Sequence, residues 1–219
     1  MRVVIFDVDG TLVDSQAEIM AAMEVAYAGE GLTVPTRQQV LSIVGLSLVE
    51  AFTKLSPKAD TMRLVAGYKQ AFTDLRGADG KGGESPLFAG MADLIDQLHA
   101  QDETLLAVAT GKSKRGLDKM IERHGFGGKF FSQQVADFHP SKPHPAMVQA
   151  VLADTGVDAD KTVMIGDTTY DIDMGRAAGV KTIGVAWGYH PHDTLRADRI
   201  VHDHTALELA IDELTGHTT

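Results

Sequence analysis

Five short apolar runs, rich in β-branched residues, constrain the fold of this 219-residue chain more than any other feature. They span residues 3–6, 104–109, 130–135, 162–165 and 182–186, and Gly, Asp or Thr residues bound them. Apolar runs of about four to eight residues are typical of buried parallel strands. Helical patterns at 91–100, 114–124, 145–155 and 170–178 lie between the runs, and another at 205–214 follows them. This alternation predicts an α/β fold with a doubly wound, Rossmann-like parallel sheet.

The alternation is interrupted between the first and second runs. Residues 15–83 contain no convincing strand pattern, and helical patterns occur instead at 16–29, 37–44, 47–55 and 58–75. The Gly-rich segment 77–83 closes this block and has the composition of a hinge or linker. We therefore expect an all-α domain at 15–83, inserted into an α/β core made of residues 1–14 and 84–219.

The composition limits the partners of the chain. Its 30 acidic and 20 basic residues give a formal charge of -10, which argues against nucleic acid because phosphate backbones need a basic surface. No apolar run approaches the roughly 20 residues that span a bilayer, and the apolar stretch before Asp7 is too short for a signal peptide. The lack of cysteine excludes disulfides and thiolate sites. We expect a cytoplasmic protein with small partners and no membrane contact.

Polar residues follow the first two expected strands. Asp7 and Asp9, in the sequence Asp7–Thr11, are a carboxylate pair that could do nucleophilic and acid/base work at a strand end. A solvated turn that simply ends the strand is an equally good interpretation of this motif alone. Thr110 and Gly111 end the second run and offer a hydroxyl and backbone N–H groups to a phosphate. Taken alone, they are more typical of an ordinary strand-to-helix turn.

Two further motifs complete the pattern. Lys142 stands between prolines in a stiffened loop and could neutralise clustered carboxylates and phosphate oxygens, although a lone loop lysine is usually only solvated. Asp167 and Asp171 follow the fourth run, and carboxylates from two strand ends are ligands that Mg²⁺ prefers. Alone, Asp171 could merely favour a helix N-terminus. Four strand ends that each carry such residues indicate a phosphate site with Mg²⁺.

In their order and spacing, these four motifs resemble those of the haloacid dehalogenase superfamily of aspartyl-phosphate phosphotransferases. The resemblance covers essentially the whole chain and is greatest to the phosphoglycolate phosphatase-like subgroup. It implies that block 15–83 is the family's helical cap, inserted directly after the first motif. The gap between Val135 and Lys142 is too short for the alternative cap position.

The resemblance also implies roles for the motif residues. Asp7 would attack the substrate phosphorus and form an aspartyl-phosphate, while Asp9 would act first as an acid and then as a base. Mg²⁺ would be held by the Asp7 and Asp167 carboxylates and the Asp9 backbone carbonyl. Asp171 would either support the metal through water or orient Lys142. The phosphoryl oxygens would be held by Thr110, Lys142 and backbone N–H groups near Val8, Asp9 and Gly111.

The substrate is expected to contact the cap. Gly45 matches a glycine in the cap loop that reaches over the active site in capped relatives, although a plain helix–helix turn explains it equally well. As the resemblance implies, Asp9 disfavours cleavage of carbon–halogen and carbon–phosphorus bonds, because members with those activities lack it. We predict a Mg²⁺-dependent phosphatase acting on a small phosphorylated metabolite, phosphoglycolate-like or a sugar phosphate, as a monomer or homodimer. The alternatives are a sugar phosphomutase and a non-catalytic module that binds a phosphorylated ligand.

Overall fold

The core of the protein is a parallel sheet of six strands. In the computed structural model, which describes residues 1–75 and 85–216, the strand order is β3-β2-β1-β4-β5-β6. The bounds are β1 Arg2–Phe6, β2 Thr104–Thr110, β3 Phe130–Val135, β4 Thr162–Gly166, β5 Lys181–Val185 and β6 Arg199–Val201. The first five lie within one residue of the expected apolar runs, which confirms the predicted parallel sheet. The short β6 was not predicted.

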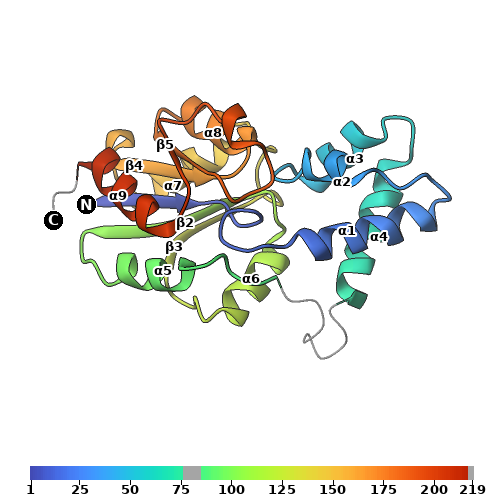
Figure 1. Cartoon of the computed structure of the whole chain (residues 1–219), viewed down its shortest axis with the longest axis horizontal. Helices are drawn as coiled ribbons and strands as arrows, with labels where there is room; N and C mark the ends of the chain where they lie inside the picture. Colours follow the sequence, from blue (N-terminus) through green and yellow to red (C-terminus); the bar gives the residue numbers. More distant parts are fainter. Residues whose placement is uncertain (76–84, 217–219) are drawn as a thin grey trace.

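Helices cover both faces of the sheet, as a doubly wound fold requires (Figure 1). Successive residues of β1 point to opposite faces: Val4 and Phe6 enter one apolar cluster, while Val3 and Ile5 enter the other. The helices of the core are α5 Met91–His99, α6 Lys114–Arg123, α7 Ala146–Thr155, α8 Thr169–Ala177 and α9 His204–Thr215, with short 3-10 turns η1 Ala159–Lys161 and η2 His192–Thr194. Helices α5, α6 and α9 contribute to the first cluster, and α7 and α8 to the second.

A separate group of helices lies at one end of the sheet, and we call it the helical unit. It consists of α1 Gln16–Gly29, α2 Arg37–Leu41, α3 Leu48–Leu55 and α4 Thr61–Leu75. The unit has its own apolar cluster, in which the rings of Tyr27 and Tyr68 flank Phe52 at centroid distances of 6.1 and 5.8 Å. Two helices are shorter than expected, since α2 ends at Leu41 and α4 begins at Thr61. The expected Gly-rich hinge and the boundary at residue 83 lie outside the described residues.

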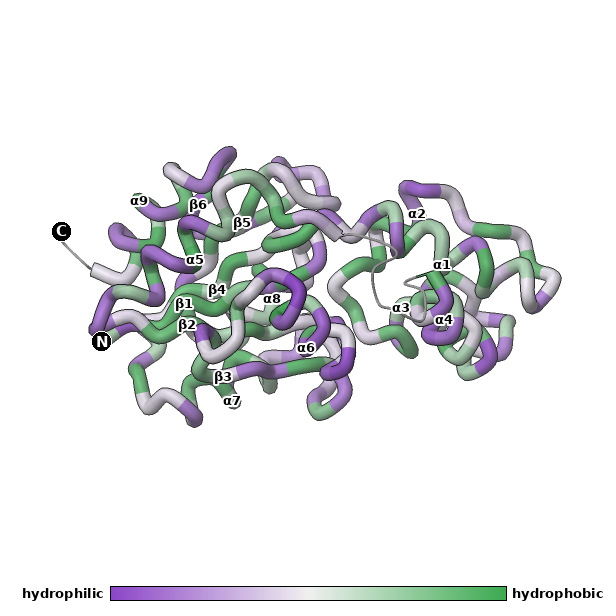
Figure 2. Tube along the Cα trace, turned by 90° about the horizontal axis from the view of Figure 1, so that it is seen from below, coloured by the Kyte–Doolittle hydropathy of each residue, from purple (hydrophilic) through white to green (hydrophobic). Residues whose placement is uncertain are grey.

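The carboxyl ends of the central strands point toward the helical unit (Figure 1). Apolar segments run along the strands of the core, and a second apolar group lies inside the unit (Figure 2). Because the strands end at the helical unit, any ligand site at the strand ends lies between the sheet and this unit.

Among the described residues, no helix is long and apolar enough to cross a membrane.

Candidate active site

A buried lysine and three buried carboxylates gather at the ends of β1 and β4. Asp7 follows β1, Asp167 follows β4, and Asp171 lies in the first turn of α8. Lys142 reaches them from the loop between β3 and α7, and its Nζ lies 2.6 Å from Asp7 Oδ1 and 2.6 Å from Asp171 Oδ1. None of the four residues is more than 2% exposed. The structure therefore brings together residues from three of the four motifs.

The cluster contains more negative than positive charge. Burial raises the pKa of Asp7 to about 7; Lys142 opposes this rise, and repulsion by Asp171 adds to it. Burial likewise raises the pKa of Asp167, and repulsion by Asp171 and Asp7 raises it further. Burial disfavours the Lys142 ammonium, but the Asp171 and Asp7 carboxylates outweigh that effect and raise the lysine pKa. A further positive charge would stabilise the ionised carboxylates.

The same cluster fits a divalent cation. Carboxylate oxygens of Asp7, Asp167 and Asp171 lie within 4.8 Å of one another. Asp7 Oδ2 is buried and has no hydrogen-bond partner among the described residues, although its other oxygen contacts Lys142. Oxygen donors of this kind suit a hard cation, and a cation here would satisfy the buried Asp7 oxygen.

Two polar contacts and a close packing contact fix Asp167. Thr11 Oγ1 donates to Asp167 Oδ1 at 3.1 Å, and the backbone N–H of Tyr189 donates to Asp167 Oδ2 at 2.8 Å. Gly10 has φ +91°, and a Cβ there would lie 2.2 Å from Asp167 Oδ2. Glycine is therefore required after Asp9, because the first loop must pass directly against the second acidic strand end.

The two oxygens of Asp171 have different partners. Asp171 Oδ2 accepts hydrogen bonds from the backbone N–H of Thr168 at 3.0 Å and from its hydroxyl at 2.7 Å, forming a capping box at the start of α8. The remaining Asp171 oxygen contacts Lys142. Of the two roles left open for Asp171, the geometry directly supports the orientation of Lys142.

Asp9 lies beside a lysine that the sequence reasoning did not assign to the site. The Nζ of Lys112 contacts both Asp9 carboxylate oxygens, at 2.7 and 2.8 Å. The backbone N–H of Lys112 also donates to Thr110 Oγ1 at 3.2 Å. The segment Gly111–Ser113 is not the end of a P-loop, because Leu106 stands where that motif needs a glycine. The available signal was the position of Lys112, two residues after a candidate phosphate ligand.

The backbone groups expected to bind phosphate lie in two tight turns. The carbonyl of Val8 accepts from the backbone N–H groups of Leu12 and Val13, at 2.9 and 3.0 Å, which holds the first loop in a compact turn. Gly111 follows β2 directly, next to the buried Thr110. Both turns therefore lie at the strand ends, where the four motifs were expected to meet.

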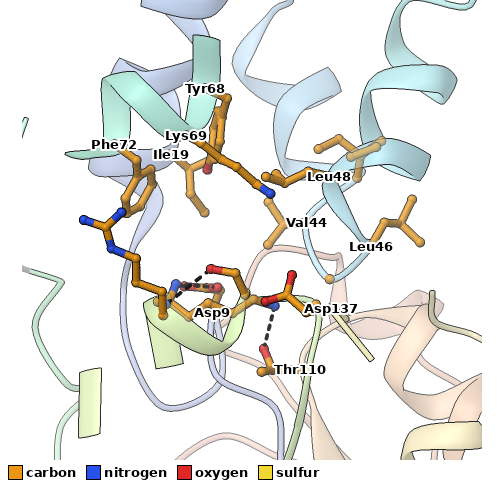
Figure 3. A pocket seen from close by; sticks show the side chains of 18 of the residues that line it. Asp9, Ile19, Val44, Leu46, Leu48, Tyr68, Lys69, Phe72, Thr110 and Asp137 are labelled. Carbon is orange, nitrogen blue, oxygen red and sulfur yellow. Dashed lines mark hydrogen bonds and ion pairs between the residues drawn. The ribbon is translucent and has the colours of Figure 1, made fainter. Parts of the chain in front are cut away.

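A cavity of about 310 Å³ opens over these residues. Asp7, Asp9, Thr110 and Gly111 line its floor, and Gly45 contributes from the helical unit. Asp9 and Thr110 lie below the side chains of the unit in Figure 3. A Cβ at Gly111 would lie 2.4 Å from the carbonyl oxygen of Gly45. The structure thus places Gly45 at the cavity, as predicted, whereas its contact with substrate stays a prediction.

Comparison with known proteins gives consistent matches. The model of the family "Haloacid dehalogenase-like hydrolase" matches residues 4–185. A probable phosphatase, IndB of Dickeya dadantii, is 35% identical over 89% of this chain and 85% of its own length. A phosphoglycolate phosphatase of Agrobacterium fabrum is 31% identical over 95% of this chain and 91% of its own. The crystal structure of a hydrolase from Pseudomonas syringae superposes with TM-score 0.83 and 22% identity, over 97% of this chain and 99% of that one.

Proposed function

Because this chain belongs to the haloacid dehalogenase-like hydrolases and is a phosphatase, we propose that it hydrolyses a small phosphorylated metabolite through an aspartyl-phosphate on Asp7. The observation that carries the proposal is the position of Asp7. Its carboxylate is buried against Lys142, yet the same residue lines the floor of the cavity. It is thus shielded from solvent by the fold and accessible to a ligand in the cavity.

We propose Mg²⁺ as the cofactor, held by Asp7, Asp167 and the backbone carbonyl of Asp9, with Asp171 alongside. The three carboxylates fit a hard divalent cation, which would also satisfy the unpartnered Asp7 Oδ2. When bound, the metal supplies positive charge that reduces repulsion between the nucleophile and the phosphate dianion. Lys142 supplies the other cation from within the cluster.

In the first step, a carboxylate oxygen of Asp7 forms a bond to phosphorus as the bond to the leaving oxygen breaks. Asp9, two residues on and at the same cavity floor, donates a proton to that oxygen, so the product leaves as an alcohol. The Thr110 hydroxyl and the N–H groups of Val8, Asp9 and Gly111 would hold the phosphoryl oxygens. In the second step, Asp9 takes a proton from water, which attacks phosphorus and releases phosphate and the Asp7 carboxylate.

Lys112 must exchange partners during this cycle. Its ammonium contacts both oxygens of Asp9, and Asp9 needs one of them for proton transfer. A phosphoryl group bound in the cavity offers the ammonium another anionic partner, because Lys112 lines the same cavity as Asp9 and Thr110. We therefore assign Lys112 to substrate positioning.

We propose that residues 15–83 act as a cap. The backbone N–H of Ser47 in the helical unit donates to Ser141 Oγ at 2.8 Å, next to Lys142. The unit thus closes the cavity opposite Asp7, where it would exclude bulk water during phosphoryl transfer. The cytoplasmic location and the monomeric or dimeric state stay predictions.

The test is phosphate release with Mg²⁺, measured for the wild-type protein, two variants of the site and one control variant. Asp7→Asn should abolish release, whereas Asp102→Asn, at an exposed carboxylate outside the cavity, should leave it unchanged. Asp9→Asn should slow alkyl phosphates more than aryl phosphates, whose leaving groups need less protonation. Wild-type release by Asp7→Asn would remove Asp7 as the nucleophile. Isomerised sugar phosphate without free phosphate would favour the phosphomutase, and no turnover of any ester would favour a binding module.

A further inference from the structure

The wall of the cavity opposite the catalytic floor is mostly apolar, although Lys69 and Thr73 of α4 also line it. It is contributed by α1, by the segment that joins α2 to α3, by α3 and by α4. In Figure 3, these side chains lie across the cavity from Asp9 and Thr110. The apolar residues labelled there are Ile19, Val44, Leu46, Leu48, Tyr68 and Phe72.

Contacts between the helical unit and the core fix the position of this wall relative to the strand ends. The carbonyl of Gly45 lies so close to Gly111 that a Cβ at Gly111 would lie 2.4 Å away. The Tyr170 hydroxyl donates to the carbonyl of Ser42 at 2.9 Å, so a second contact joins α8 to the end of α2. Both contacts flank Val44, which is 7% exposed. A leaving group above Asp7 would therefore lie against this wall.

We propose that the preferred substrate is a phosphate monoester whose leaving group is an apolar, ring-sized body, an inference that rests on the proposed phosphatase function. The cavity volume of about 310 Å³ lies at the lower end of small-molecule sites. A two-carbon leaving group would leave the apolar wall in contact with water, whose molecules each occupy about 30 Å³. A ring covers that wall and packs against Tyr68 and Phe72.

The same wall disfavours sugar phosphates. A sugar would place several hydroxyl groups against Val44, Leu46 and Leu48, which offer no side-chain hydrogen-bond partner. Each hydroxyl buried without a partner lowers the affinity on the order of tenfold. A carboxylate held against these three side chains would lose its hydration without gaining a partner from them, and would have to turn toward Lys69 to be paired.

The cationic side chains at the cavity have a different role from the apolar ones. Arg115 and Lys119 lie one turn apart on α6, and Lys69 on α4 is exposed. In a chain with a net charge of -10, local positive charge attracts the phosphate dianion toward the cavity. These cations therefore attract the phosphate group, which all monoester substrates share. The apolar side chains of the wall distinguish among the leaving groups.

The experiment compares benzyl phosphate, glucose 6-phosphate and phosphoglycolate, with Mg²⁺ and by phosphate release. All three are esters of primary alcohols, so each leaving oxygen needs protonation and the comparison isolates the rest of the leaving group. We expect kcat/KM for benzyl phosphate to be at least tenfold higher than for the other two. Equal or higher kcat/KM for glucose 6-phosphate or phosphoglycolate would overturn the inference and leave the phosphatase function intact.

Variants of the wall make the test sharper. Phe72→Ala should lower kcat/KM for benzyl phosphate about tenfold and reduce its preference over phosphoglycolate, while Phe138→Ala, an exposed aromatic outside the cavity, should change neither. Val44→Thr keeps the side-chain shape, adds a hydroxyl and should shift the preference in the same direction, which covers the case that Phe72→Ala fails to fold. An unchanged preference in a folded wall variant would overturn the inference. No phosphate release from these esters or from p-nitrophenyl phosphate would instead remove the proposed function and the inference with it.

Discussion

Replacing Asp7 by asparagine should stabilise the metal-free protein at alkaline pH, although it removes the proposed nucleophile. Burial raises the pKa of Asp7 from 3.8 to about 7, so the folded protein holds a proton that the unfolded chain releases. The stability that this proton provides is fully present below pH 3.8 and is lost as the pH rises through about 7. Above that pH, the folded state must contain an ionised carboxylate in a buried site.

The size of the effect follows from the pKa shift. Each pKa unit corresponds to about 1.4 kcal/mol, so a rise from 3.8 to about 7 makes ionised Asp7 unfavourable by about 4 kcal/mol at pH 8. At pH 5 the same relation gives about 1 to 2 kcal/mol, because Asp7 is then protonated in the folded state. Asparagine carries no charge at either pH. The substitution should therefore increase the free energy of unfolding by about 4 kcal/mol at pH 8 and by clearly less at pH 5.

The assay is urea denaturation in EDTA at pH 5 and pH 8, with Asp102→Asn as the control at an exposed carboxylate. The control should change the free energy of unfolding by less than about 0.5 kcal/mol at both pH values. An Asp7→Asn variant that is less stable than wild type at pH 8 would refute the reasoning, because pairing with Lys142 would then outweigh burial. An equal gain at both pH values would also refute it. Saturating Mg²⁺ should reduce the advantage, since it stabilises the wild-type protein.

Three further predictions use the same geometry. Mg²⁺ should bind about tenfold more tightly at pH 8 than at pH 6, because the pKa of Asp7 is about 7 and a proton on Asp7 competes with the metal. Calorimetry measures the affinity, and an affinity that does not change with pH would contradict this prediction. Lys142→Met should abolish phosphate release and lower the free energy of unfolding, measured in urea, by about 3 to 5 kcal/mol, because Asp7 and Asp171 would lose the buried cation between them. A decrease in the free energy of unfolding below about 1 kcal/mol would contradict this prediction. Gly111→Ala should raise KM in steady-state kinetics, because its Cβ would displace Gly45 from the cavity; wild-type kinetics would show that this close approach is not needed.

The fold could be predicted closely because its signals are local. Strands β1, β2, β4 and β5 are largely apolar runs, whereas β3 has polar residues at 132–134 between its apolar ends. The runs at 3–6 and 104–109 end next to the residues that form the site. Strand β6 was missed, since Arg199–Val201 is only three residues long and Arg199 is exposed. It pairs with β5 at an edge of the sheet, and that pairing depends on tertiary contact rather than on a sequence pattern.

The site was predictable where side chains lie directly at strand ends, as Asp7 and Asp167 do. The lysine that contacts Asp9 was missed, because Lys112 reaches its partner across 103 residues of sequence. The apolar character of the cavity wall was missed for a related reason. Ile19 and Phe72 belong to different helices, and only the packing of the helical unit brings both to one cavity. Contacts between residues far apart in the sequence depend on tertiary packing, which the hydrophobic periodicity of the sequence does not predict.

The central claim is that Asp7 carries the phosphoryl group during turnover, and acid quenching tests it most directly. The Asp9→Asn variant is mixed with p-nitrophenyl phosphate and Mg²⁺, quenched in acid, digested with pepsin and analysed by mass spectrometry, because loss of the base should let the intermediate accumulate. We predict the added mass of a phosphoryl group on the peptide that contains Asp7, and none in Asp7→Asn treated identically. A phosphoryl group on another residue, or turnover in the wild-type protein with no modified peptide in either protein, would contradict the account.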